Sequence, residues 1–330
     1  MRNLKNVRCL VASVAALALT ACGGGGGGDN VGTDAPPTPS PTNFVAEVPK
    51  PTYATESLEL LFFNQLNDVR NNYGVGLLAQ NTMLDQAARN HSKYQITNDV
   101  MGHDEDPSKP GFTGAGPADR TKTTGYTSGL RWWQVGEVIS YDTLTASTKC
   151  VEGLLSTVFH QALLIDYSYK DIGIAYTDKL TSTYGNCVIN TGASAAQGNS
   201  PQIAPEDWIG VYPYNGQEVH RIGFSGETPD PLPSVAVKGH AISIHANKDW
   251  AIEAKTFTVS ANGQMIAVKL LGNTEFPDYL NKYILFALPV APLTPGMTYQ
   301  VHFEGTFKKG NASREVTKDW SFTTAVNATS

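Results

Sequence analysis

The hydrophobic positions of this chain follow a helical period in its first half and a period of two in its last third. Apolar residues recur every three or four positions from Leu58, and Gly74 follows as a stop, so we expect a helix between them. Asn81 is a favoured N-cap residue and predicts a second helix with His91 on its apolar face. The later pattern predicts strands over 135–141 and 172–176, a helix over 143–159, and a loop over 101–129 with at most a short helix near 118–124.

Past Pro233 the pattern becomes that of short β-strands. Phe257 and Val259 alternate with polar positions, and the dipeptide Asn262-Gly263 then predicts a hairpin turn. The alternation returns over 266–270 and 299–303. Short strands at this spacing predict a β-sandwich of immunoglobulin-like type, so the fold class of the whole chain is α+β.

The N-terminus has the features of a secretory signal. A basic start precedes an apolar run from Cys9 to Leu19, which is too short to cross a bilayer as a helix. Leu19-Thr20-Ala21-Cys22 resembles a bacterial lipobox, in which Cys22 becomes the lipidated first residue, and a glycine run follows as a flexible tether. We therefore expect an exported protein held to the membrane by a lipid on Cys22, and Gly23 favours the outer membrane of a Gram-negative cell. The alternative is an ordinary signal peptide with a chance cysteine.

Composition marks the boundaries between the parts. Residues 23–52 are rich in Gly, Pro and Thr and predict a disordered spacer, and small polar residues begin a second linker after Gly192. The expected organisation is a signal peptide over 1–22, the spacer over 23–52, a first domain over 53–192, a linker over 193–232 and a second domain over 233–328.

Charge and cysteine content limit the partners and the redox state. The formal net charge is −6 and no basic patch occurs, so we expect no nucleic acid partner. Cys150 and Cys187 are the cysteines that follow Cys22, and two cysteines in an exported domain form a disulfide more often than two free thiols. The alternative, a cysteine metal site, lacks the paired CxxC spacing.

A series of short motifs follows one order between residues 58 and 176. They are Leu66-Asn67-x-x-Arg70, Ala87-Ala88-x-x-His91-Ser92, Gly102-His103, Asp119-Arg120, Gly136-Glu137, Gly153 with Ser156 and His160, and Ile172-Gly173-Ile174. In this order they resemble the bacterial branch of the CAP (SCP-like) superfamily, which implies an α-β-α sandwich. Val138, Leu154 and residues 157–161 depart from the family pattern. The run 292–299, with Trp320 and Phe322, resembles bacterial Ig-like domains.

The resemblance implies a cleft lined by two histidines and one or two carboxylates. Carried over to this chain, these residues are His103, Glu137 and His160. Asp104, Glu105 and Glu152 are candidates for the second carboxylate, and Glu105 is preferred because it lies two residues from His103.

Three functions remain open for such a cleft. Because CAP relatives include lipid-binding, sterol-binding and host-interaction proteins, we expect a non-enzymatic surface module that binds a small molecule, a lipid, a metal or a protein partner in this cleft. The alternative is a metal-dependent hydrolase of peptide or cell-wall bonds, with Zn²⁺ on His103 and His160 and Glu137 as the base. The third possibility is a structural envelope protein, in which the histidines only fix the packing.

The other histidines receive structural assignments. His91 lies on an apolar helix face, where a hydrogen-bonded structural role is more frequent than metal binding. The remaining ones have no metal-ligand spacing and are expected to face solvent: His220, His240, His245 and His302.

Overall fold

The computed structural model describes residues 42–141, 149–178, 185–195 and 201–330, so the predicted signal segment and Cys22 lie outside the described residues. Helix α1 spans Leu58–Tyr73 and ends where Gly74 takes a left-handed conformation, with φ of 83°. Helix α2 spans Thr82–Asn98, and the Asn81 side chain accepts hydrogen bonds from backbone N–H groups of its first turn. Both predicted helix boundaries are thus confirmed. None of the helices in the described ranges combines the length and apolar character needed to cross a membrane.

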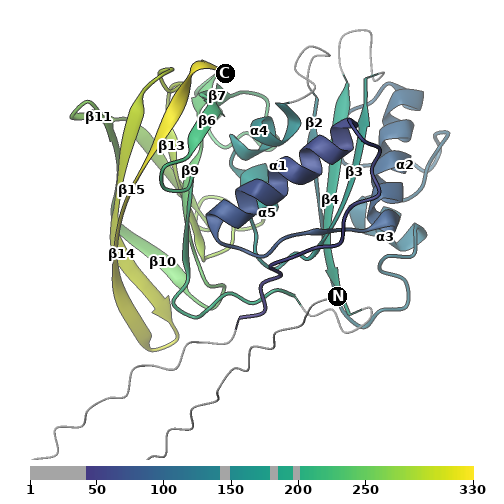
Figure 1. Ribbon diagram of the computed structural model, residues 1–330, viewed down its shortest axis with the longest axis horizontal. Helices are drawn as coiled ribbons and strands as arrows, with labels where there is room; N and C mark the ends of the chain where they lie inside the picture. Colours follow the sequence, from purple (N-terminus) through teal and green to yellow (C-terminus); the bar gives the residue numbers. More distant parts are fainter. Residues whose placement is uncertain (1–41, 142–148, 179–184, 196–200) are drawn as a thin grey trace, which may run out of the picture. The chain divides into compact units, whose positions relative to one another are not determined.

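Four strands form the sheet that these helices cover. In spatial order they are β1 (Ala79–Gln80), β3 (Asp171–Thr177), β4 (Asn186–Ser194) and β2 (Trp133–Ser140). Strand β1 runs parallel to β3, and the other neighbours are antiparallel. Helices α2 and α3 (Pro117–Thr123) cover one face, and α1 covers the other with α4 (Cys150–Leu155) and α5 (Phe159–Leu164), as Figure 1 shows.

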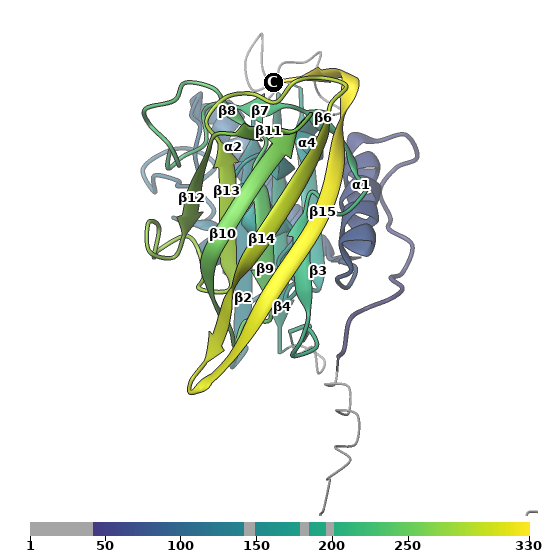
Figure 2. The ribbon, with the colours of Figure 1, turned by 90° about the vertical axis from the view of Figure 1, so that its left-hand side faces the viewer.

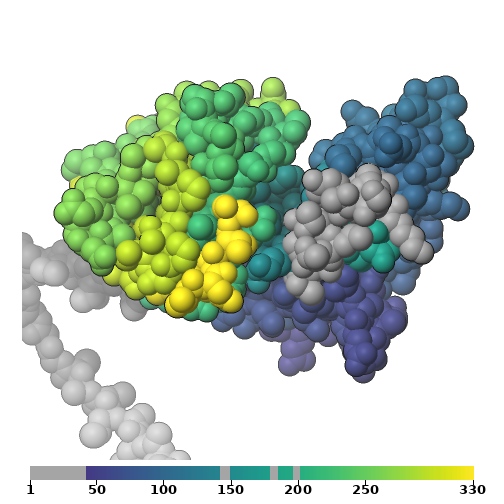
Figure 3. Space-filling view, turned by 90° about the horizontal axis from the view of Figure 1, so that it is seen from above, coloured from purple at the N-terminus to yellow at the C-terminus, as the bar shows by residue number. Residues whose placement is uncertain are grey.

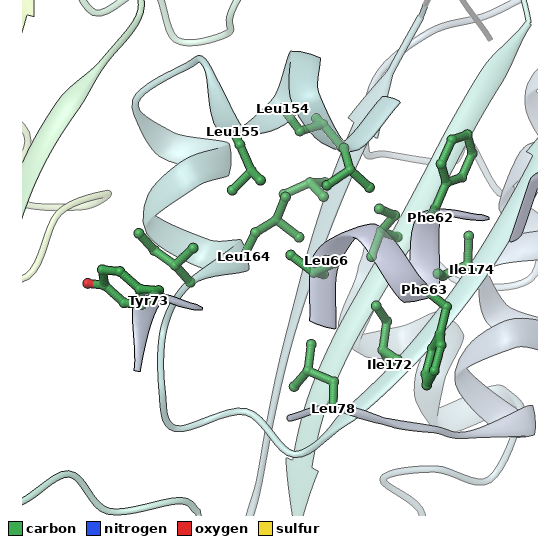
Figure 4. Close-up of a cluster of buried hydrophobic side chains, with 14 of the residues drawn as sticks. Phe62, Phe63, Leu66, Tyr73, Leu78, Leu154, Leu155, Leu164, Ile172 and Ile174 are labelled. Atoms are coloured by element: carbon green, nitrogen blue, oxygen red, sulfur yellow. The ribbon is translucent and has the colours of Figure 1, made fainter. Parts of the chain in front are cut away.

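The strand residues alternate between the two faces and so build two cores. Val138, Ile174 and Ile189 belong to the larger core, which lies beneath α1, α4 and α5 and is shown in Figure 4. Their strand neighbours Ile139, Ala175 and Val188 lie in a smaller core with Ala88 of α2. Successive residues of a strand point to opposite faces, which explains the split. The predicted α-β-α sandwich is confirmed.

The predicted disulfide joins the two cysteines that follow Cys22. Cys150 at the start of α4 is bonded to Cys187 of β4 and ties a covering helix to a strand of the sheet. The helix expected over 143–159 is shorter: α4 ends at Leu155 and α5 starts at Phe159, while residues 142–148 lie outside the described residues.

Two further sheets form the second domain. Their spatial orders are β11-β10-β14-β15-β6 and β12-β13-β9-β5. The strands are β5 (Ile209–Tyr212), β6 (Glu218–Arg221), β9 (Ile242–Ala246), β10 (Ala251–Ala261), β11 (Gln264–Ile266), β12 (Val268–Gly272), β13 (Ile284–Pro289), β14 (Thr298–Lys309) and β15 (Ala312–Thr329). A separate pair consists of β7 (Gly223–Phe224) and β8 (Lys238–Gly239).

The two larger sheets enclose one hydrophobic core. Phe257, Val301 and Phe322 of the first sheet lie in the same buried cluster as Ile244 and Ala287 of the second. Figure 2 shows the long strands β10, β14 and β15 running side by side across this domain. The arrangement is consistent with the expected Ig-like domain and gives the chain its α+β class.

Both predicted linkers contain ordered structure. Strands β5 and β6 lie within residues 193–232 and extend the two sheets of the second domain, β5 beside β9 and β6 beside β15. Each has only four residues, which is too short for a period of two to be recognised. Residues 42–52 lie against the first domain, where Val45 donates its N–H to Gln202 Oε1 at 2.7 Å and accepts from Leu77 N at 2.8 Å.

The expectation that the four C-terminal histidines face solvent is wrong for two of them. His240 and His245 are buried. His240 donates from Nδ1 to the Arg221 carbonyl at 2.9 Å, and His245 lies on β9, which is buried along its whole length. Burial lowers the pKa of His240 to about 4 and that of His245 to about 3, so both rings are neutral at neutral pH.

The two domains pack against each other through apolar and polar contacts. Val158 and Ala162 lie in one buried cluster with Phe286 of the second domain. Gln161 reinforces this contact, because its Nε2 donates to the Leu155 carbonyl at 2.7 Å and to the Ala241 carbonyl at 3.0 Å. In the space-filling view of Figure 3, the green and yellow surface of the second domain lies beside the purple and blue surface of the first.

Candidate functional site

Glu137 stands at the centre of a buried charged cluster. It lies on the edge strand β2 and points to the face covered by α2 and α3, since the adjacent Val138 belongs to the core on the other face. Arg120 of α3 donates from Nη2 to Glu137 Oε1 at 2.7 Å, and His103 Nδ1 lies 2.9 Å from the same oxygen. Arg120 also donates from Nη1 to the His103 carbonyl at 2.8 Å. One guanidinium therefore positions both residues.

The surroundings of Glu137 keep it ionised. Burial by itself raises the pKa of this carboxyl group, but the hydrogen bond from His103 and the charge of Arg120 outweigh burial and lower it. An ionised carboxylate can only accept a hydrogen bond, so the His103 Nδ1 carries the shared proton. In the neutral ring Nε2 is then an acceptor, and the His103 side chain is 43% exposed, so a ligand can reach it.

A second buried pair supports this cluster from behind. His91 Nδ1 lies 2.9 Å from Glu105 Oε1, and His91 Nε2 lies 2.9 Å from the Gly102 carbonyl. Glu105 also accepts from the Thr113 N–H at 2.7 Å, and its Oε1 is 3.9 Å from Arg120 Nη1. The His91–Glu105 pair thus holds the loop that carries His103, which is the structural role expected for His91.

His160 reaches the site from the opposite side of the sheet. It lies on α5, and its Nδ1 is 3.1 Å from Glu227 Oε1 and 2.9 Å from Thr157 Oγ1. Glu227 comes from the second domain, in the segment after β7, and its side chain is fully buried. It also accepts the backbone N–H groups of Val158, Phe159 and His160 at 2.9, 2.7 and 3.2 Å. A carboxylate of the second domain therefore fixes both the start of α5 and the orientation of His160.

Both histidines line one cavity at the edge of the first sheet. Its volume is about 310 Å³, and His103, Glu137 and His160 contribute to its wall. The second domain supplies the facing wall, which includes Asp278, Tyr279 and Asn281. The exposed Tyr279 ring lies 5.2 Å from that of Phe159 and forms an aromatic surface beside the polar groups. The site is therefore built by both domains.

The predicted residues take different places around this cavity. The structure brings His103, Glu137 and His160 to it, whereas Glu105 pairs with His91 behind it. The sequence prediction did not include Arg120 and Glu227 as site residues. Arg120 lies in a family motif that already pointed to it, but a carboxylate from the presumed linker carries no signal in the sequence. In the described ranges, no group of three or more His, Cys, Asp and Glu side chains is arranged to hold a metal ion.

Comparison with known proteins finds a family match and similar structures for the first domain. Residues 63–190 match the family model described as CAP, the cysteine-rich secretory protein family. No curated protein matches the chain. Among solved structures, an outer surface protein from Borrelia burgdorferi is similar, with 15% identity and a TM-score of 0.35, over 43% of this chain and 96% of that protein. An extracellular protein containing an SCP domain from Bacillus anthracis is 20% identical with a TM-score of 0.32, over 40% of this chain and 39% of that one.

Proposed function

Because residues 63–190 of this chain form a domain of the cysteine-rich secretory protein (CAP) family, we propose that the protein is an exported, lipid-anchored module that binds a small polar ligand in the cleft between its two domains. The observation that carries this proposal is the shared arrangement of His103 and His160. Each ring has its Nδ1 beside a buried carboxylate, Glu137 or Glu227. Each Nε2 is therefore left as a hydrogen-bond acceptor for a bound molecule.

The cavity wall favours a ligand that carries several hydroxyl groups. Asp278 and Asn281 add acceptors to the two imidazoles, so a ligand with O–H donors satisfies them. Tyr279 and Phe159, whose rings are tilted by 46° to each other, offer aromatic faces against which the apolar face of a ring can pack. A few polar groups beside an aromatic surface are typical of small-molecule sites. A monosaccharide has both properties and serves as the probe.

Binding of monosaccharides tests this proposal. We expect saturation-transfer NMR with a panel of monosaccharides to show binding to the wild-type protein, and His103→Ala or His160→Ala to weaken it at least about tenfold, or about 1.4 kcal/mol. His302→Ala is the matched control, because its side chain is also 43% exposed but lies on β14 of the second domain. No binding to the wild type, or binding that both cleft variants retain, would contradict the proposal.

The second candidate is a metal-dependent hydrolase that holds Zn²⁺ on His103 and His160. A carboxylate bonded to the second ring nitrogen is common for metal-binding histidines, and both rings have one. Glu137 fits the role of base less well, because Arg120 and the hydrogen bond from His103 lower its pKa. Equilibrium dialysis against Zn²⁺ separates the candidates. One ion bound near neutral pH, and lost in both histidine variants, would favour the hydrolase.

Export and anchoring rest on the signal segment and Cys22. We expect the wild-type protein to partition with membranes when produced in a Gram-negative host, and Cys22→Ser to remain unprocessed at the higher mass of its precursor. Because acylation of Cys22 precedes cleavage in the lipobox scheme, an ordinary signal peptidase product in the variant would instead indicate a chance cysteine. Cys9→Ser is the control and is expected to leave processing unchanged, since it lies within the removed segment.

A further inference from the structure

A second cavity lies between the domains on another side of the molecule. Its volume is about 200 Å³, and it is separate in its lining from the cleft that contains His103 and His160. Helices α1 and α4 contribute Gln65 and Glu152, and the second domain contributes Tyr212, Arg221 and His240. Its size suits a molecule smaller than a typical drug.

Polar atoms in the wall of this cavity lack partners within the protein. His240 is only 2% exposed, and its Nδ1 donates to the Arg221 carbonyl, so its Nε2 must accept. Among the residues that the structure describes, neither His240 Nε2 nor Gln65 Oε1 has a hydrogen-bond partner, and both are acceptors. The Arg221 Nε is an unpartnered donor in the same wall. Unpaired buried polar atoms are costly, and a ligand with two donors and one acceptor would satisfy them.

The charges and apolar surfaces of the cavity wall further limit the chemical class of the ligand. Three carboxylates, Asp68, Glu152 and Glu218, line the cavity against the guanidinium of Arg221. His240 is neutral, and the other histidine of the wall, His220, lies 3.8 Å from Glu218. An excess of negative charge attracts a cation. The Tyr212 ring stacks on His240 with centroids 6.0 Å apart, and aliphatic side chains of α1 and α4 complete the wall. A flat hydrophobic group therefore fits beside the polar atoms.

From this geometry we infer that the cavity between α1, α4, β5 and β6 is a binding site for a small aromatic or aliphatic primary amine that also carries a hydroxyl group. The ammonium group donates to His240 Nε2 and Gln65 Oε1 and lies near the Glu152 carboxylate. The hydroxyl oxygen accepts from Arg221 Nε. The site is independent of the cleft proposed above, so each proposal can fail without the other.

Three probes of nearly equal shape test the inference by NMR titration of the whole protein. Tyramine carries an ammonium group, tyrosol has a hydroxyl in its place, and 4-hydroxyphenylpropionate has a carboxylate. We expect tyramine to bind at least about tenfold more tightly than tyrosol and the carboxylate not to bind measurably, because only the amine complements the acidic wall. Equal binding of all three compounds, or none by tyramine, would overturn the inference.

Variants locate the bound amine. Glu152→Gln removes a charge from a partly exposed side chain, and His240→Asn retains a donor near the Arg221 carbonyl while it removes the Nε2 acceptor. Both are expected to weaken tyramine binding at least about tenfold, a change of about 1.4 kcal/mol. Glu47→Gln, an exposed carboxylate outside this cavity, and His103→Ala in the cleft should leave it unchanged. If Glu152→Gln retains wild-type affinity, or His103→Ala loses it, the amine does not bind at this site.

Discussion

Replacing Arg120 with methionine is expected to destabilise the protein by about 3–5 kcal/mol at neutral pH, because it leaves buried carboxylates without their cation. The side chains of Glu105 and Glu137 are both fully buried, and the Arg120 guanidinium lies 3.9 Å from the first and 2.7 Å from the second. Methionine fills much of the same volume, so the loss comes from charge rather than from a cavity. The variant should also lose the hydrogen bond that holds the His103 carbonyl, and with it ligand binding in the cleft.

The pH dependence of this variant distinguishes an unpaired charge from poor packing. In the wild type the pKa of Glu137 is lowered, so its contribution to stability is present above the pKa of the unfolded chain and is lost as pH falls through the folded pKa. Without Arg120, burial is opposed mainly by the hydrogen bond from His103, so the pKa of this carboxyl group rises relative to the wild type. The folded variant then binds a proton more readily than the folded wild type, so its deficit relative to the wild type shrinks towards acid pH.

Urea unfolding at pH 7 and pH 5 measures both effects. Arg131→Met, at an exposed position just before β2, is the matched control and is expected to change the free energy of unfolding by less than about 0.5 kcal/mol. The double variant Arg120→Met/Glu137→Gln should recover part of the loss, since it removes one of the stranded charges. The smallest loss in the free energy of unfolding that we expect is ~3 kcal/mol. An Arg120→Met protein within about 1 kcal/mol of the wild type would therefore show that the cluster tolerates an unpaired carboxylate.

Local signals in the sequence predicted much of the first domain. Helix α1 follows from its apolar spacing and the glycine that ends it, and α2 follows from its Asn81 cap. Strand β4 was not predicted, although all nine of its residues are buried. Polar residues such as Asn186 and Asn190 interrupt its apolar pattern, and they are tolerated because they are hydrogen-bonded inside the domain: Asn186 accepts from Ser92 and donates to Gln95. A strand buried in this way has neither of the patterns that periodicity can detect.

The site residues likewise divide into those that local motifs predicted and those that only the tertiary fold brings to the cleft. His103, Glu137 and His160 lie in motifs, so resemblance alone brought them to one cleft, and the structure places all three on its wall. Glu227 could not be found in this way. Its role depends on how the second domain packs against α5, and such a contact across 67 residues of chain leaves no spacing in the sequence. The wall of the cavity around Tyr279 also depends on how the second domain packs against the first.

Acidification is expected to destabilise the protein from about pH 6.5 downwards, above the range in which most carboxylates titrate. Burial lowers the pKa of His240 to about 4 and that of His245 to about 3, whereas both titrate near 6.5 in the unfolded chain. Between these values the unfolded chain binds protons that the folded protein excludes, so stability falls as pH falls from about 6.5 towards 4. Each histidine removes about 3 kcal/mol by pH 4, a large share of the stability of an ordinary domain.

The position of His245 links this loss to the cleft. Its ring packs edge-on against Tyr73 of α1 at 5.9 Å and against Phe286 of β13 at 6.2 Å, so it lies where the two domains meet. Its Nε2 donates to Ser243 Oγ, which in turn donates to Gln161 of α5. Charging this ring therefore weakens the same contact that places Glu227 beside His160, and ligand binding in the cleft should fail together with folding stability.

Urea unfolding between pH 7 and pH 4 tests this with two substitutions. His245→Gln retains a donor near Ser243, His240→Asn retains one near the Arg221 carbonyl, and neither new side chain titrates. Each variant is expected to lose about half of the pH dependence between 6.5 and 4.5, the window in which carboxylates contribute little. His302→Gln, at a partly exposed histidine on β14, should retain all of it. A wild-type stability that stays flat down to pH 4.5 would mean that the domain interface admits the two charges, and that His245 does not couple the interface to the cleft.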